Sequence, residues 1–298
     1  MKSLFEDTDM GAPMPKLLVR YGELGLKSAS VRRRFEMMLM QDIRRKHMLA
    51  KVPCVITSTR GRMFVDSDDW RRSMELLSRT FGVVSFSPVV EVSSGLDELK
   101  KSTLEFASPL ISRDATFAIR TRRTGNHPYT SQTLAEKLGE VVLEAHRDRG
   151  LKVALDDPDI EIFVEVREKT AYLFSAALPG PGGMPKATQG RILSLVEDDR
   201  GAASSWLMMK RGCNVIPATA DVALVGPLRS WDPDLKPAHP ETDLFALARC
   251  HDCAGIALSW GLDELSEKAP LKGDLPVFYP LIGMTKDEVG ALRERIGR

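Results

Sequence analysis

Between Gly190 and Gly212 a short apolar run is followed by a tight loop and a helical pattern, which is the layout of a nucleotide site. The run RILSLV predicts a strand, and we expect a helix to begin near Ala202. In such units the loop and the helix N-terminus normally bind phosphate, because unpaired backbone N–H groups point at the ligand. This loop instead carries acids and a single glycine: Glu197, Asp198, Asp199, Arg200 and Gly201.

The carboxylates in this loop argue against phosphate binding. Each acid would repel a triphosphate by on the order of 1 kcal/mol or more near a surface. Asp198 or Asp199 is suited to cap the following helix, because a carboxylate accepts hydrogen bonds from its first backbone N–H groups. We therefore interpret residues 197–201 as a degenerate nucleotide loop without a catalytic residue. The alternative is that the carboxylates hold Mg²⁺, which in turn binds nucleotide.

Basic residues gather at two places in the N-terminal half, which suggests a nucleic-acid surface. One group accompanies the first strand and helix: Arg20, Lys27, Arg32, Arg33 and Arg34. The other lies at the end of the strand pattern ATFAIRTRR: Arg120, Arg122 and Arg123. Arg120 and Arg122 should share one face of that strand, and paired guanidinium groups suit phosphate oxygens. A solvated helix face is the alternative explanation for the triple arginine.

Two further segments are assigned to the same RNA surface. His127 and Tyr129 follow the arginine strand in a loop, where they could stack on an unpaired base. Lys137 is in the next helical pattern. Glycines and prolines crowd into LPGPGGMPKATQG, where Gly182, Gly183, Lys186 and Gln189 either allow close approach to a ligand or form a rigid corner between domains.

The elements that position these residues divide the chain into five parts. We expect a disordered extension over residues 1–15 and a β-α-β-β-α-β ferredoxin-like domain over 16–92. A second α+β domain should occupy 93–178, followed by a linker over 179–190. Apolar strands alternate with helices over 191–298, which predicts a parallel α/β domain.

Composition indicates an ordinary globular protein. Hydrophobic residues make up 43% and charged residues 28% of the 298 residues. The sequence has neither a membrane span nor a signal peptide, so we expect a cytoplasmic protein. Its four cysteines do not form a secreted disulfide framework, and the lone Cys250-His-Asp-Cys253 pattern is too weak to predict a metal site.

Seven blocks in order give the chain its family resemblance: RYGELGLKSASVRRRFE, FGVVSFSP, FAIRTRR, DDPDIEIFVEVREKTAYLF, GPGGMPKATQGRILSL, LMMKRG and PVFYPLIGMTKDEV. Together they resemble the tRNA 4-thiouridine synthetase (ThiI) family. The resemblance implies a ferredoxin-like domain, a THUMP domain that binds the tRNA acceptor end and CCA terminus, and a PP-loop domain. It also implies a homodimer, and an activity that adenylates a uridine with ATP and Mg²⁺ before a cysteine delivers sulfur.

The resemblance fails at the residues that would perform this chemistry. The family's PP-loop reads Ser-Gly-Gly-x-Asp-Ser, whereas alignment of the flanks leaves this loop one residue short and puts Arg200 at the aspartate. No counterpart of the family's catalytic cysteine segment is found before Arg298. We therefore expect a tRNA-binding accessory module without ATP-dependent activation and without a cofactor. The alternative is an active sulfurtransferase, for tRNA or for thiamine thiazole synthesis, with a rebuilt ATP site and an external sulfur-carrier protein.

Overall fold

The computed structural model describes residues 16–22, 28–59 and 61–297, so the predicted extension over 1–15 and Lys27 lie outside the described residues. The first six elements have the expected order β-α-β-β-α-β. They are β1 (Lys16–Tyr21), α1 (Ala29–Leu49), β2 (Val55–Thr59), β3 (Arg62–Asp66), α2 (Trp70–Ser78) and β4 (Val83–Ser93).

The middle of the chain continues with strands and helices in the order α-β-α-β-β-β. These elements are α3 (Leu96–Ala107), β5 (Thr116–Thr124), α4 (Ser131–Ala145), β6 (Lys152–Val153), β7 (Ile160–Arg167) and β8 (Thr170–Phe174), with a 3₁₀-helix η2 (Arg147–Arg149) after α4. The hairpin between β7 and β8 turns at Glu168, whose φ of 52° lies in the left-handed region.

The C-terminal part alternates strands and helices. Its elements are β9 (Leu178–Pro179), β10 (Arg191–Leu195), α5 (Asp199–Lys210), β11 (Asn214–Ala218), the 3₁₀-helix η3 (Val222–Ser230), α6 (Leu244–Cys250), β12 (Ile256–Ala257), α7 (Leu262–Glu267), β13 (Val277–Phe278) and α8 (Lys286–Gly297). Helix α5 begins at Asp199, so our expectation of a start near Ala202 was wrong by one turn.

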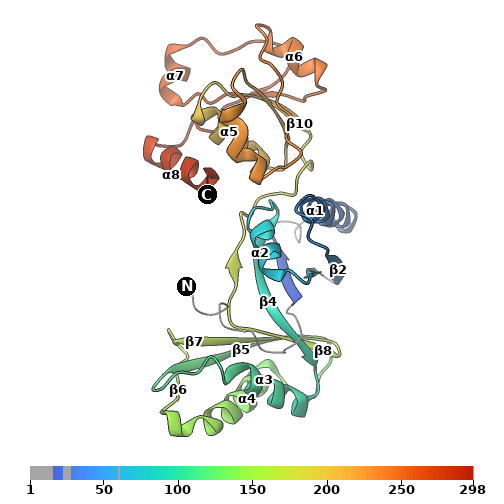
Figure 1. Ribbon diagram of the computed structural model, residues 1–298, viewed down its shortest axis with the longest axis vertical. Coiled ribbons are helices and arrows are strands. Elements are labelled where there is room, and N and C mark those ends of the chain that lie inside the picture. The colour runs from blue at the N-terminus through green and yellow to red at the C-terminus, as the bar shows by residue number, and fades with distance from the viewer. Residues whose placement is uncertain (1–15, 23–27, 60, 298) are drawn as a thin grey trace. The chain divides into compact units, whose positions relative to one another are not determined.

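The chain forms two compact units. The first contains Met1–Val19, Met63–Trp70 and Phe86–Leu178, and the second contains Arg20–Arg62, Arg71–Ser85 and Pro179–Arg298. In the first unit, strands are hydrogen-bonded in the order β3-β1-β4-β8-β7-β5-β6. Strand β7 runs parallel to β5 and antiparallel to β8. Figure 1 shows α3 and α4 together against one face of this sheet.

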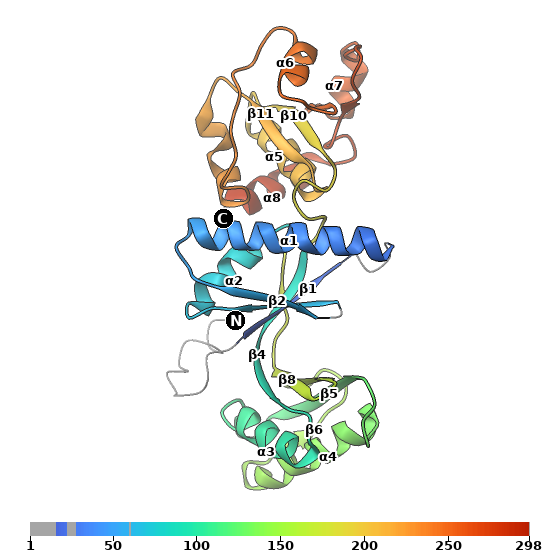
Figure 2. The same cartoon turned by 90° about the vertical axis from the view of Figure 1, so that its right-hand side faces the viewer.

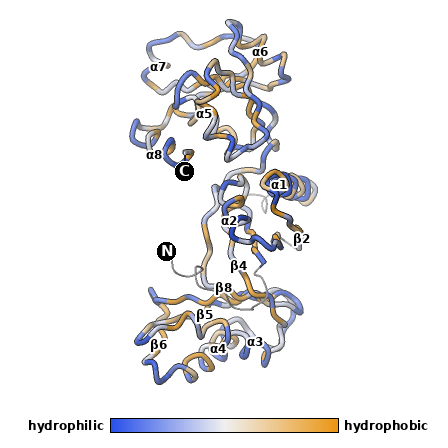
Figure 3. The backbone as a smooth tube through the Cα atoms, in the orientation of Figure 1, coloured by the Kyte–Doolittle hydropathy of each residue, from blue (hydrophilic) through white to orange (hydrophobic). Residues whose placement is uncertain are grey.

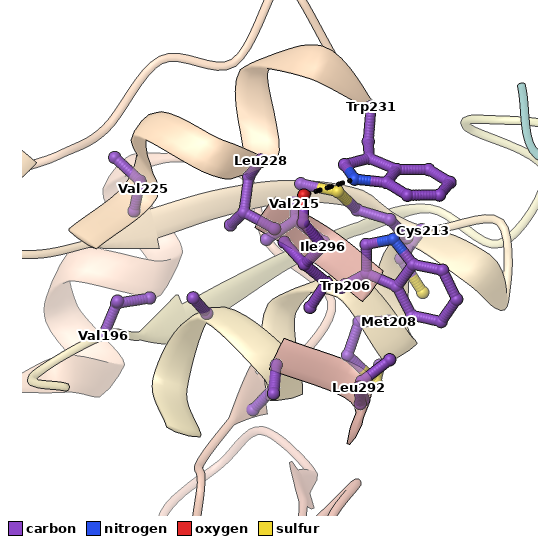
Figure 4. Packing of buried hydrophobic residues seen from close by; sticks show 14 of the residues in the cluster. Val196, Trp206, Met208, Cys213, Val215, Val225, Leu228, Trp231, Leu292 and Ile296 are labelled. Atoms are coloured by element: carbon purple, nitrogen blue, oxygen red, sulfur yellow. Dashed lines mark hydrogen bonds between the residues drawn. The ribbon is translucent and has the colours of Figure 1, made fainter. Parts of the chain in front are cut away.

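The second unit contains a wholly parallel sheet with the order β11-β10-β12-β13, as the alternating pattern predicted. Helix α5 lies alongside β10 and β11 (Figure 2). Alternate residues of β10 enter different cores, because side chains of a strand point to opposite faces. Ile192 belongs to a cluster with Trp206 and Val215, part of which is drawn in Figure 4, whereas Leu193 joins a second cluster with Ile256.

Helix α1 in the second unit is amphipathic. Phe35, Leu39 and Ile43 recur every four residues and are buried. The arginines at positions 32–34 and 44–45, on either side of this stretch, are exposed, as expected for a helix with one apolar face. Both hydrophobic and hydrophilic segments are accordingly visible in α1 in Figure 3. Among the described residues, no helix combines the length and apolar character that crossing a membrane requires.

Candidate nucleotide loop and nucleic-acid interface

The loop after β10 closes on itself through the first residue before α5. Asp198 is the N-cap, and its Oδ1 accepts a hydrogen bond from the backbone N–H of Gly201 at 2.9 Å. The cap that the sequence predicted is therefore confirmed at Asp198. A carboxylate at this position also stabilises the positive end of the helix dipole. The N–H group that a phosphate would use is occupied by the chain itself.

The two remaining charged residues of the first turn of α5 form ion pairs. Asp199 pairs with Arg293 of α8. Arg200 pairs with Glu264 of α7 and donates a hydrogen bond to the carbonyl oxygen of Ser259 at 3.1 Å. The hydrogen bond from Arg200 lowers the pKa of Glu264 to about 2. These contacts connect the start of α5 to α7, which follows β12, and to α8, near the C-terminus.

Gly201 is required by packing. A Cβ atom at this position would lie 2.7 Å from Cα of Val196 and 3.0 Å from the carbonyl oxygen of Leu195. Below it, Ser205 Oγ donates to Ser194 Oγ at 2.8 Å, which pairs two fully buried hydroxyl groups. The helix therefore approaches the strand closely, as in nucleotide-binding units, although the loop lacks their composition.

The arginines at the end of β5 differ in their surroundings. Arg120 is half-buried; it binds Glu161 Oε1 at 2.9 Å and the carbonyl oxygen of Leu155 at 2.5 Å. Arg122 and Arg123 are exposed, and Arg123 donates a long hydrogen bond of 3.3 Å to the carbonyl oxygen of Gly125. Arg122 and Arg123 are therefore the cations of this group that could meet a polyanion.

Tyr129 lies in the core and not in an open loop. Its side chain is 7% exposed, and its hydroxyl donates to the carbonyl oxygen of Ser94 at 2.7 Å. His127 stacks on it, with ring centroids 5.5 Å apart. Tyr129 precedes the N-cap Thr130 and shares a cluster with Leu134, which is the arrangement of a hydrophobic staple. The ring of Tyr129 thus has a structural role, and only His127 is partly accessible for stacking.

The triple arginine at the start of α1 is exposed. Arg32 lies 3.9 Å from Glu36, and Arg32 and Arg33 line a hollow of about 380 Å³ together with Glu36 and Gly61. Arg34 is exposed on the next position, and Lys137 is exposed on α4. Arg20 in β1 is half-buried.

The glycine-rich segment before β10 forms a corner. Gly182 and Gly183 have φ angles of 67° and 75°, and a Cβ on Gly183 would lie 2.1 Å from the carbonyl oxygen of Lys210. Lys186 binds the buried Asp232 at 2.5 Å. Gln189 is exposed, and its backbone N–H donates to the carbonyl oxygen of Gly212 at 3.1 Å. Internal contacts thus account for Gly183 and Lys186 without a ligand.

The cysteines provide no reactive pair in the described structure. Burial raises the pKa of Cys253 to about 11, and Cys250 is exposed. No group of three or more His, Cys, Asp or Glu side chains among the described residues is arranged to hold a metal ion.

Comparisons with known proteins identify the two N-terminal domains. Residues 16–87 match the ThiI ferredoxin-like domain, and residues 93–176 match the THUMP domain. A probable tRNA sulfurtransferase of Methanobrevibacter smithii is 38% identical over 336 residues, covering 94% of this chain and 86% of the relative. The corresponding protein of Methanosarcina acetivorans is 30% identical, covering 94% and 81%.

Two solved structures share the fold. The crystal structure of PH1313 from Pyrococcus horikoshii matches with a TM-score of 0.81 and 30% identity, covering 96% of this chain and all of that chain. A 4-thiouridine synthetase in complex with RNA and ATP matches with a TM-score of 0.77 and 20% identity, covering 96% and 85%. The extent of these matches, together with the two N-terminal domains, shows that the chain belongs to the tRNA sulfurtransferase (4-thiouridine synthetase, ThiI) family.

Proposed function

We propose that this chain is a tRNA-binding member of the family that acts as an accessory or binding module and lacks ATP-dependent activation of the base. The observation that carries the proposal is the closed loop before α5. Asp198 caps the first turn of α5, and Arg200 in that turn is paired with Glu264. A nucleotide would have to displace both contacts before its phosphates reached the helix N-terminus.

The residues present do not fit a triphosphate. Glu197 is exposed beside the capping carboxylate, and Asp199 adds a third negative charge within one turn. The only glycine of the loop is Gly201, whose N–H already donates to Asp198. Mg²⁺ bound by these acids would compete with the N–H of Gly201 for Asp198 and with Arg293 for Asp199, which supports the degenerate site over a rebuilt one.

Binding of tRNA is supported by the relatives and by the exposed cations. Curated relatives are named tRNA sulfurtransferases, and the THUMP match covers the arginine strand. Exposed basic side chains on both compact units offer phosphate contacts: Arg33, Arg34, Arg122, Arg123 and Lys137. A sulfur-carrier protein or another partner would then activate the base and deliver sulfur. We also propose that the chain forms a homodimer and is located in the cytoplasm.

A calorimetric titration with Mg·ATP, in the presence and absence of tRNA, tests the proposed loss of ATP-dependent activation of the base. We expect no saturable ATP binding at millimolar nucleotide, together with measurable tRNA binding. Micromolar ATP binding that disappears in Glu197→Ala or Asp199→Ala would support the active sulfurtransferase, which the names of the relatives favour.

Two arginine variants test the proposed binding of tRNA. Arg122→Ala should weaken tRNA binding uniformly across sequences and reduce the slope of log K against log salt by about 1, because one phosphate contact is lost. Arg120→Ala is the matched control, since Arg120 is held by Glu161 and Leu155. Equal effects of the two variants, or an unchanged salt slope in Arg122→Ala, would contradict this assignment.

A further inference from the structure

The core of the parallel sheet contains a side chain that comes from the N-terminal part of the chain. Phe81, three residues after α2, is 3% exposed and belongs to the cluster around α5. Its ring centroid lies 5.3 Å from that of Trp206 and 5.4 Å from that of Trp231. The segment between α2 and β4 is therefore anchored in the C-terminal domain by an aromatic side chain.

Ionic contacts join the same parts at the C-terminal end of α1. Arg45 Nε donates to both carboxylate oxygens of Asp234 at 3.0 Å, and its NH2 group donates to Oδ1 at 2.6 Å. The neighbouring Lys46 is buried, and its ammonium donates to the carbonyl oxygen of Arg79 at 2.7 Å. Asp232, two residues before Asp234, is buried against Lys186. The two buried charges each have an opposite charge as partner: Lys46 lies 3.3 Å from Asp42, and Asp232 is paired with Lys186. Buried charges are normally paired in this way.

Backbone hydrogen bonds complete the connection. The N–H of Gly82 donates to the carbonyl oxygen of Gly182 at 2.8 Å, and the N–H of Gly182 donates to the carbonyl oxygen of Val83 at 2.8 Å. The N–H of Met184 donates to the carbonyl oxygen of Lys210, the last residue of α5, at 2.9 Å. Three separate segments of the second compact unit are thus locked together by apolar, ionic and backbone contacts. We call these contacts the α1 clamp.

The clamp lies on the same helix as the exposed arginines. Arg34 and Arg45 are eleven residues apart in α1, which corresponds to about three turns and about 16 Å along the axis. Their side chains therefore leave the helix in nearly the same direction. Because a continuous helix is stiff over this distance, fixing its rotation at Arg45 also fixes the directions in which Arg33 and Arg34 project.

We propose that the C-terminal parallel domain orients α1 through the α1 clamp, so that Arg33 and Arg34 are presented to tRNA phosphates at a fixed angle. Arg45, Phe81 and Asp234 are positioning residues in this scheme, and they touch no RNA. The inference rests on the proposed tRNA-binding function. It gives the C-terminal domain a role that needs no nucleotide.

A charge swap across the clamp tests the proposal. Asp234→Arg adds positive charge, so electrostatics alone predicts tighter tRNA binding, whereas loss of the clamp predicts weaker binding by about fivefold. Arg45→Asp should weaken binding to a similar extent, and the double variant should restore the wild-type affinity. Arg44→Asp is the matched control, because it makes the same charge change at an exposed neighbour on α1.

Hydrogen exchange of the α1 amides, measured without RNA, separates the two proposals. We expect faster exchange in each single variant and wild-type protection in the swap and in Arg44→Asp. Tighter or unchanged binding by Asp234→Arg, or weakened binding that the swap does not rescue, would overturn the clamp while leaving tRNA binding intact. A wild-type protein that protects α1 but binds no tRNA would instead overturn the proposed function.

Discussion

Replacement of Phe81 by alanine is the perturbation that tests the packing of the second compact unit most directly. Phe81 is 3% exposed, its ring stacks on that of Trp231, and it meets the ring of Trp206 edge-on. Removal of a buried phenylalanine ring costs about 3–5 kcal/mol through lost burial and the cavity that remains. The two aromatic contacts account for about 0.5–1.5 kcal/mol each within that total.

The expected loss of about 4 kcal/mol is large enough for a simple assay. In urea, with an m value of about 3 kcal/mol per M, the unfolding midpoint of this unit should fall by more than 1 M. Tryptophan fluorescence reports the change locally, because the rings of Trp206 and Trp231 both contact the deleted ring. Phe81→Leu keeps much of the volume and should cost about 1 kcal/mol.

Two results would refute this reasoning. A midpoint that falls by less than about 0.3 M, worth about 1 kcal/mol at that m value, would mean that Phe81 is not a core residue of this unit. A leucine variant as unstable as the alanine variant would mean that ring contacts, and not filled volume, dominate the site.

Three further substitutions address the loop and the corner. Because the folded pKa of Glu264 is lowered to about 2, its contribution is present above pH 4.5 and lost as the pH falls toward 2. Glu264→Gln should therefore remove about 1 kcal/mol of the loss in unfolding free energy that the wild-type protein shows on acidification, a value reduced for solvent screening. Urea unfolding at a series of pH values measures this loss. An unchanged pH dependence in the variant would contradict the pair with Arg200. Gly183→Ala should destabilise the protein by more than Gly182→Ala in thermal unfolding, since both have positive φ but only Gly183 faces a carbonyl oxygen at 2.1 Å; equal losses would contradict the close approach. Asp198→Ala should cost about 1 kcal/mol through the lost cap, and Asp198→Asn less, as circular dichroism melts can compare.

Local sequence rules predicted the elements and the helix cap. The β-α-β-β-α-β order and the parallel C-terminal sheet follow from apolar periodicity, and the cap at Asp198 follows from its place before a helical run. The start of α5 was misjudged because Arg200 and Gly201 were assigned to the loop. A capping aspartate three residues before Gly201 already predicts a helix from Asp199 onward.

Long-range partners were beyond these rules. Nothing in the sequence pairs Arg120 with Glu161, because the match depends on the register of two parallel strands. Lys186 and Asp232 likewise meet only through the fold. Tyr129 could have been recognised, since an apolar residue before a Thr cap with leucine four positions into the helix is a hydrophobic staple.

The cap of α5 has a consequence for any ligand that approaches this helix. The carboxylate of Asp198 is tethered to the N–H group that it binds, so it competes with free phosphate groups as an intramolecular ligand. Short tethers give effective concentrations in the millimolar range or above, at or above those of soluble nucleotides. Restoring glycines to the loop while leaving Asp198 in place would therefore leave this competitor at the site, and an engineered nucleotide site would have to begin with its removal.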